Sequence, residues 1–233
     1  MPKTALKYKR ILLKVSGEIF DSSKALESFV LEMRALQKLG VKIGIVVGGG
    51  NIWRFRDHAN LKLDRVTSDT MGMVATIINA LALVGALKAG GVAAVGMSAL
   101  RCEKAIENYD VKKALKYFND GKIVVFAGGT GSPFFTTDSA AALRGVEMKC
   151  DVVMKATKVD YVYDKDPLKF KNAKKFLKMT FKQVMDKNLG VMDIACAAIC
   201  EEGRIPMLVF NMSKDGNIKK AVMGAKIGTL ISH

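Results

Sequence analysis

Short apolar runs alternate along the chain with longer segments in which apolar residues recur at helical spacing. The runs at 11–15, 41–47, 92–95, 122–127, 151–156 and 205–210 have the length and composition of buried strands. Helices are predicted over 26–36, 70–87, 110–119, 138–148, 180–187 and 193–202. This alternation predicts an α/β fold: an open, mostly parallel sheet with helices on both faces, in three α/β/α layers. No repeat or linker divides the chain, so we expect one domain over 1–233.

The stretch from Thr70 to Leu87 carries no charge and reaches the length of a membrane-spanning helix. Thr76, Asn79 and several small residues dilute its hydrophobicity, and no second span follows. A helix that is apolar all round is also typical of a domain centre or a subunit contact. We therefore predict a buried helix of a soluble protein and no membrane partner.

Charge and rare residues narrow the chemistry. The chain has 37 Lys and Arg against 22 Asp and Glu, a net charge of +15, and its two histidines are His58 and His233. So few imidazoles exclude a Ser-His-Asp triad and a histidine-rich metal site. The positive charge leaves three classes open: a nucleic-acid binder, a membrane-surface protein, or an enzyme acting on small polyanions.

The cysteines and the N-terminus indicate the compartment. Cys102, Cys150, Cys196 and Cys200 lack the spacing of a zinc site or a disulfide framework, so we expect reduced thiols in the cytoplasm and no bound metal. Residues 1–17 do not have the pattern of a signal peptide. The segment 165–182 is rich in lysine, with eight if Lys158 upstream is counted, and reads either as a solvated loop or as a positive wall near a phosphate site.

Three predicted strands end in glycine-containing turns: Lys14-Val15-Ser16-Gly17, Gly48-Gly49-Gly50-Asn51 and Gly128-Gly129-Thr130-Gly131. Such turns let successive backbone N–H groups approach an anion, and ligands of parallel sheets bind beyond the carboxyl ends of the strands. One such turn is common structural punctuation, whereas three at one sheet edge favour phosphate binding. None matches the Walker A or the dinucleotide-binding motif.

Charged residues beside these turns suit phosphoryl transfer. Lys14 interrupts an apolar strand, which is unfavourable unless its ammonium meets an anion, and Arg54 follows the second turn. Asp69 precedes the uncharged stretch, and Asp138 opens a helix, where it also suits the helix dipole. Two cations, two acids and three anion cradles fit a reaction that needs positioning and charge neutralisation more than a covalent nucleophile.

At these residues the chain resembles the bacterial UMP kinases (uridylate kinases) of the amino acid kinase family. The resemblance runs nearly end to end, and TGSPFFTTDSAA is its most specific part. The matching segments are YKRILLKVSGE at 8–18, VVGGGNIWR at 46–54, DRVTSDTMGMVATIINALAL at 64–83, AGGTGSPFFTTDSAAALRGVE at 127–147, DVVMKATKVDYVYDKDP at 151–167 and VFNM at 209–212.

This resemblance implies the amino acid kinase fold and transfer of the γ-phosphoryl group of ATP to UMP, with Mg²⁺ held mainly by phosphates. It places acceptor binding mainly in the N-terminal part and ATP binding from about residue 150. The implied catalytic residues are Lys14, Arg54 and Asp138. The implied ATP contacts are Lys14, Val15, Ser16, Gly17, Gly50, Arg54, Thr157, Lys158, Tyr163 and Asp166. The implied UMP contacts are Gly49, Asp69, Thr130, Gly131, Ser132, Pro133, Phe134, Phe135, Thr136 and Thr137.

The resemblance also implies a homohexamer, with the stretch 70–87 suited to a subunit contact, and regulation by UTP and GTP. Residues 97–110, where GTP contacts lie in such proteins, fit the family pattern poorly, which leaves GTP activation open. Tyr161 stands where the family usually has glycine. After Glu18 the chain is shorter than many relatives.

Three alternatives stay open at this point. The first is a carbamate or amino-acid kinase of the same family, against which the segment FFTTDSAA argues. The second is a non-enzymatic nucleotide-binding or storage protein on the same fold, which the presence of Lys14, Arg54 and Asp138 disfavours. The third is a nucleic-acid binder, for which the chain has charge but no recognition motif.

Overall fold

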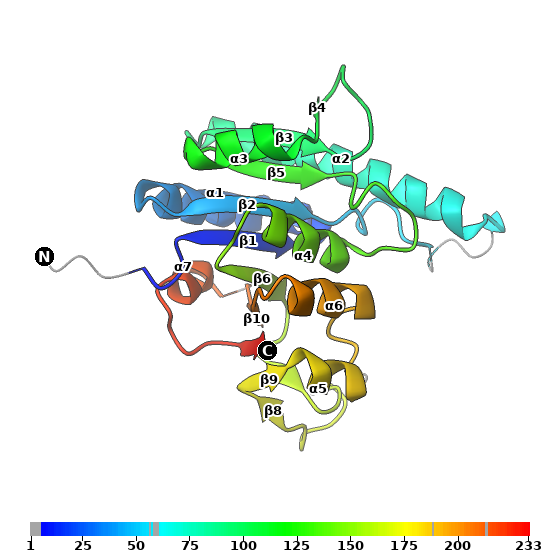
Figure 1. The fold of residues 1–233 in the computed structure, drawn as a ribbon, viewed down its shortest axis with the longest axis vertical. Helices are drawn as coiled ribbons and strands as arrows, with labels where there is room; N and C mark the ends of the chain where they lie inside the picture. The colour runs from blue at the N-terminus through cyan, green and yellow to red at the C-terminus, as the bar shows by residue number, and fades with distance from the viewer. Residues whose placement is uncertain (1–5, 56, 58–60, 188, 213) are drawn as a thin grey trace, which may run out of the picture.

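The computed structural model describes residues 6–55, 57, 61–187, 189–212 and 214–233 (Figure 1). His58 and residues 1–5, part of the segment without a predicted signal peptide, lie outside these ranges. Within them, nine strands form the main sheet. Their order is β4 (Glu107–Asn108), β3 (Ala94–Ser98), β5 (Ile123–Ala127), β2 (Lys42–Val47), β1 (Arg10–Val15), β6 (Val152–Thr157), β10 (Met207–Asn211), β11 (Thr229–Ser232) and β9 (Lys178–Thr180).

The strands from β4 to β10 are all parallel, and β11 pairs antiparallel with β10. β9 runs parallel to β11 at the edge of the sheet. Two short strands, β7 (Val162–Tyr163) and β8 (Lys175–Phe176), form a separate antiparallel pair. The predicted α/β class with a mostly parallel sheet is therefore confirmed.

Helices cover both faces of this sheet, as the apolar runs predicted. One core packs the sheet against η1 (Gly17–Asp21), α1 (Ser23–Lys38), α2 (Arg65–Ala89) and α7 (Asn217–Val222). The other packs it against α3 (Val111–Asn119), α4 (Thr137–Glu147), α5 (Phe181–Asp186) and α6 (Ile194–Glu202). Along β1, Ile11, Leu13 and Val15 enter the first core, and Leu12 enters the second. Both faces of the central strands are buried in these two cores, which explains why the strands are mostly apolar.

Several element boundaries differ from the prediction for local reasons. The third strand begins at Ala94 rather than Val92, because Gly91 (φ +73°) and the bond from Val92 N to Leu87 O close the preceding helix. The segment 165–182 is not one loop, since it contributes β8 and the edge strand β9. The predicted capping box is present at the start of α5, where Thr180 and Gln183 exchange hydrogen bonds.

Helix α2 is longer than the uncharged stretch. It begins at Arg65, because the Asp64 carboxylate caps the helix through Thr67 N, so Asp69 lies inside the helix and does not precede it. Among the helices of the described residues, α2 is the one that is long and apolar enough to cross a membrane, judged by length and composition alone. One side of it, including Ile77, Ala80 and Leu83, belongs to the core beside the sheet, and its N-terminal half extends beyond the sheet (Figure 1).

Candidate active site

Two lysines lie side by side at the carboxyl ends of the central strands. Lys14 in β1 and Lys155 in β6 are register partners on the same face of the sheet. Two neighbouring ammonium groups repel each other unless an anion lies between them. Asp138, in the first turn of α4, fills that place: its carboxylate lies 3.1 Å from Lys14 Nζ and forms an ion pair and a hydrogen bond with Lys155 Nζ.

The environment of Asp138 keeps it ionised. Burial opposes the charged carboxylate, yet the charges and hydrogen bonds of Lys14 and Lys155 prevail and hold its pKa below the ordinary value. Lys155 also donates to the carbonyl oxygen of Val191. The side chains of Lys14 and Lys155 keep 18% and 14% of their surface exposed, and both line one cavity at this end of the sheet.

Buried polar groups of α2 hold two of the glycine turns. Thr76 Oγ1 accepts a hydrogen bond from Gly128 N (2.7 Å), and Asn79 donates to Gly48 O (2.7 Å). Gly128 has φ +73°, a conformation that side chains disfavour, and a Cβ on Gly49 would lie 2.8 Å from Gly72 O of α2. Backbone conformation and close packing therefore favour glycine at these two positions, in addition to the predicted role in ligand binding.

The predicted acceptor segment, Thr130–Thr137, forms most of the loop between β5 and α4 and includes Thr137, the first residue of α4. Asp69 reaches it from α2, where its carboxylate accepts the backbone N–H of Phe134 (2.8 Å) and both of its oxygens lie 2.8 Å from Arg65 Nε. Phe134 adopts φ +69°, and its ring and that of Phe135 are exposed. The structure thus brings Asp69 to the predicted acceptor segment, although the two are 65 residues apart.

The other two predicted phosphate contacts, Arg54 and Lys158, meet at a residue that the sequence analysis did not single out. Glu18 lies 2.8 Å from Lys158 Nζ and 3.9 Å from Arg54 Nη2, and the hydrogen bond from Lys158 lowers its pKa. A cavity of about 670 Å³ adjoins this group, with Lys14, Ser16, Lys155 and Lys158 in its wall. Val15 and Gly17 are buried behind it, and Gly50 packs beside the Arg54 guanidinium.

The predicted adenosine contacts share a second cavity, of about 560 Å³. Thr157, Tyr163 and Asp166 all line it, together with Lys155 and Val191. Tyr161 is part of the same wall: its ring makes an edge contact with the Tyr163 ring (6.5 Å between centroids), and Lys175 Nζ lies 4.6 Å from its centroid. We call this space the donor cavity. It meets the larger cavity at Lys155 and Thr157, which line both.

Some of these residues were missed from the sequence, and their signals differ. Lys155 interrupts the apolar run 151–156 as Lys14 interrupts its own strand, so the same criterion identifies it. Thr76 and Asn79 carried a signal too, as polar residues inside an otherwise apolar helix. Glu18 and Arg65 have no distinguishing pattern, because charged residues beside a turn or in a first helical turn are common.

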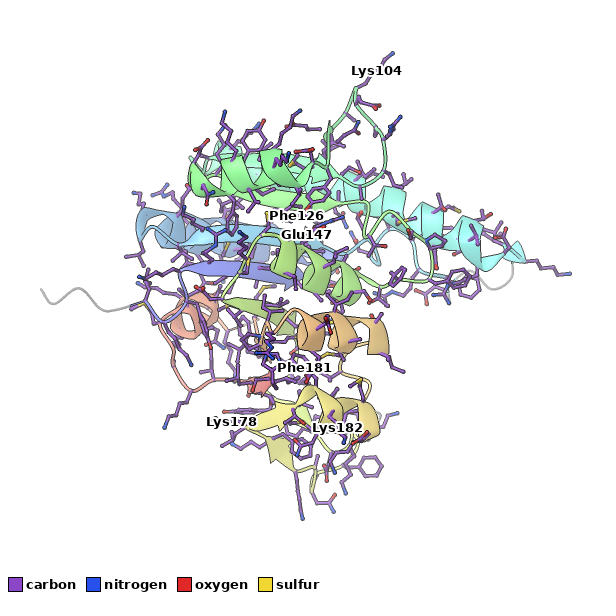
Figure 2. The ribbon with its side chains drawn as sticks, in the orientation of Figure 1. Lys104, Phe126, Glu147, Lys178, Phe181 and Lys182 are labelled. Atoms are coloured by element: carbon purple, nitrogen blue, oxygen red, sulfur yellow. The ribbon has the colours of Figure 1, made fainter. Side chains whose placement is uncertain are left out.

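A support network adjoins the turn Gly128-Gly129-Thr130-Gly131, which we call the acceptor turn, because the Gly129 carbonyl oxygen lies 3.5 Å from Nη2 of the buried Arg144 on α4. Its guanidinium bonds Glu147 (2.6 Å) and lies 3.8 Å from the centroid of the Tyr109 ring. Tyr109 donates to Glu147 (2.6 Å), and burial followed by this bond raises its phenol pKa. The Tyr109 ring also lies 5.7 Å, between centroids, from the ring of Phe126 in β5, the strand that leads into the acceptor turn; Phe126 and Glu147 are labelled in Figure 2.

Comparisons with known proteins identify the family and the fold. The model of the amino acid kinase family matches residues 9–211. The chain is 46% identical to the uridylate kinase of Stutzerimonas stutzeri over 97% of its own length and 95% of that protein. Its structure is similar to that of a UMP kinase from Bacillus anthracis (TM-score 0.93, 35% identity, 97% and 96% of the two chains). It is also similar to a UMP kinase from Ureaplasma parvum (TM-score 0.91, 34% identity, 98% and 100%).

Proposed function

The chain belongs to the amino acid kinase family, and from this premise we propose that it transfers the γ-phosphoryl group of ATP to UMP, giving UDP and ADP. It is a nucleoside monophosphate kinase. The observation that carries the proposal is the arrangement of Lys14, Lys155 and Asp138 between the acceptor segment and the donor cavity. A carbamate or amino-acid kinase, a storage protein and a nucleic-acid binder are the alternatives that the assay below separates from it.

The chemistry follows from the charges. A phosphate oxygen of UMP is already a competent nucleophile at neutral pH, so the reaction needs no histidine base. Lys14 and Lys155 stabilise the negative charge that spreads over the transferring group. Asp138 orients both lysines and keeps them from repelling each other. Arg54 and Lys158, which Glu18 holds beside the larger cavity, supply further positive charge to the ATP phosphates.

On the acceptor side, we assign UMP to the loop Thr130–Thr137, to Gly49 and to Asp69. Backbone N–H groups of the glycine turn receive its phosphate, and Asp69, fixed by Arg65 and Phe134, accepts from the ribose hydroxyls. On the donor side, Ser16, Gly17 and Gly50 approach the ATP phosphates. Thr157, Tyr163 and Asp166 bind the adenosine in the donor cavity.

The potential metal ligands of the described residues fit a magnesium ion that the phosphates of the nucleotide hold, rather than one that the protein holds. Among the described residues no group of three or more His, Cys, Asp and Glu side chains is arranged to hold a metal. Magnesium retains most of its waters and binds readily through substrate phosphates. When bound there, it neutralises phosphate charge, and Lys14 and Lys155 supply the remaining positive charge.

The proposed function is tested by an ATP-coupled assay with UMP, CMP, carbamate and acetylglutamate as acceptors. We expect turnover with UMP that exceeds turnover with the others. Turnover only with a non-nucleotide acceptor would contradict the UMP assignment, and no turnover with any acceptor would favour the storage protein. Salt-sensitive binding of DNA or RNA at physiological salt would favour the nucleic-acid binder.

We also propose that the chain forms a homohexamer in which the outer side of α2 is a subunit contact. Met71, Val74, Ile78 and Leu81 follow one stripe of the helix and are each between 37% and 53% exposed. Exposed apolar stripes of this kind are typical of protein interfaces. Ile78→Lys should reduce the sedimentation coefficient, whereas Leu31→Lys, at an exposed leucine of α1, should not. An unchanged coefficient for Ile78→Lys would contradict this contact.

Two further proposals concern the location of the enzyme and its regulation. We propose a cytoplasmic location, because all four cysteines are free and a reducing compartment keeps them so. We propose inhibition by UTP, which shares the uridine moiety of the substrate, and we do not propose activation by GTP. Steady-state kinetics with UMP in the presence of UTP or GTP separates these effects.

A further inference from the structure

Asp193 joins the two halves of the site, and the reaction described above assigns it no role. It is the N-cap of α6, where Oδ1 accepts the backbone N–H of Cys196 (2.7 Å). The same oxygen accepts a hydrogen bond from the Ser139 hydroxyl (2.7 Å), and Oδ2 accepts one from the Thr136 hydroxyl. One carboxylate therefore binds the N-termini of both α4 and α6.

The acceptor side of this bridge is the end of the loop Thr130–Thr137. Thr136 Oγ1 caps α4 by accepting from Asp138 N (3.0 Å) and Ser139 N (3.4 Å) while it donates to Asp193. Ser139 is fully buried, so its bond to Asp193 has no competition from water. Any shift of Asp193 therefore moves the end of the acceptor loop and the helix that carries Asp138.

The donor side of the bridge begins two residues before Asp193. Val191 lines the donor cavity, and its carbonyl accepts the ammonium of Lys155, whose other partner is Asp138. The segment from Val191 to Asp193 is thus attached to the acceptor half at two points. One attachment runs through Lys155 to Asp138, and the other runs through Asp193 to Thr136 and Ser139.

We infer that Asp193 is a positioning residue that couples nucleotide binding in the donor cavity to UMP binding in the acceptor loop. A donor nucleotide that orders Val191 also orders Asp193, which fixes Thr136 and the end of the acceptor loop. Such coupling is reciprocal, because each ligand must raise the affinity of the other by the same factor. This inference rests on the proposed function, since it presumes UMP as the acceptor.

The test is a calorimetric titration with UMP, with and without a non-hydrolysable ATP analogue and magnesium. For the unchanged protein we expect the analogue to tighten UMP binding by about 5-fold or more, the range usual for coupled sites. Asp193→Asn keeps an N-cap, since Asn caps helices as well as Asp, but its amide nitrogen cannot accept from a hydroxyl. The ratio of the two dissociation constants should then fall below about 2.

Asp110→Asn is the matched control, because Asp110 caps α3 in the same way (2.9 Å to Lys113 N) and lines neither the larger cavity nor the donor cavity. It should leave the ratio unchanged. If Asp193→Asn does not fold, Ser139→Ala removes a single bond of the bridge and should lower the ratio less. An unchanged ratio in a folded Asp193→Asn protein that still phosphorylates UMP would overturn this inference and leave the proposed function standing. Failure of the unchanged protein to phosphorylate UMP would overturn both.

Discussion

The acceptor and donor sides of the site are built differently, although both meet at Asp138. On the acceptor side, buried Thr76 and Asn79 of the central helix α2 bind the glycine turns directly. On the donor side, the cavity wall includes the two-residue strand β7, which lies outside the main sheet, with Tyr161, Tyr163 and Lys175 near the surface. We expect acceptor geometry to depend on buried hydrogen bonds and donor binding on stacking and charge, so the acceptor side should be the less tolerant of change.

The largest effect is expected where the two sides meet. Lys14→Ala should lower kcat by about 100-fold or more, because it removes a cation that acts on charge developing in the transition state. Circular dichroism should show the fold intact. Lys104→Ala is the control, since Lys104 lies at the tip of an exposed loop, away from the site (Figure 2). Unchanged kcat in the Lys14 variant would remove this residue from the reaction.

A smaller effect is expected from loosening the acceptor turn. Thr76→Val preserves shape but leaves the buried N–H of Gly128 without a partner, at a cost of about 1–3 kcal/mol. We expect KM for UMP to rise by about 5-fold or more, because the turn moves to give this N–H another partner and so leaves the position that binds UMP. KM for ATP should change much less, and both constants are read from initial rates.

The same helix offers a matched control for this change. Thr70 is exposed, and its hydroxyl donates to Val66 O of its own helix (2.8 Å). Thr70→Val should leave both KM values as they are. If Thr76→Val raised the two KM values equally, buried support of the acceptor turn would not distinguish the two sides.

The smallest of these effects is expected on the donor side. Tyr163→Leu should raise KM for ATP by roughly 5-fold, toward the lower end of what an aromatic–base stack contributes, with KM for UMP unchanged. Tyr163→Phe should restore the value, because it keeps the ring. Phe170→Leu changes an exposed ring in the same segment and serves as control. A larger rise in KM for UMP than for ATP would place Tyr163 on the acceptor side and contradict its assignment to the donor cavity.

Much of the fold was predictable because the main strands are buried on both faces. The length and composition of an apolar run then suffice to predict a strand. The runs 11–15 and 151–156, for example, match β1 and β6 to within one residue. The C-terminal elements were missed for physical reasons. α7 and β11 have six and four residues, and β8 and β9 lie within a lysine-rich segment whose composition resembles a solvated loop. Their structure depends on pairing with distant residues.

The site was predictable where a residue conflicts with its surroundings. Lys14 in an apolar strand signals an anion partner, and Lys155 meets the same criterion although the sequence analysis passed over it. From sequence, Asp193 is only the first residue of the predicted helix 193–202, because its bonds to Thr136 and Ser139 span more than fifty residues. For Tyr161 the sequence indicates no role, and only the structure shows that it lines the donor cavity.

Above all, we infer that Asp138 holds Lys14 and Lys155 as one unit between the donor cavity and the acceptor segment. A double-mutant cycle on kcat with Lys14→Met, Lys155→Met and both together tests it most directly. Each single change should lower kcat by about 100-fold, and the double change should cost far less than the product of the two, because residues that act as a unit are not additive. Independent, multiplicative losses, or a Lys155 variant with unchanged kcat, would contradict the account.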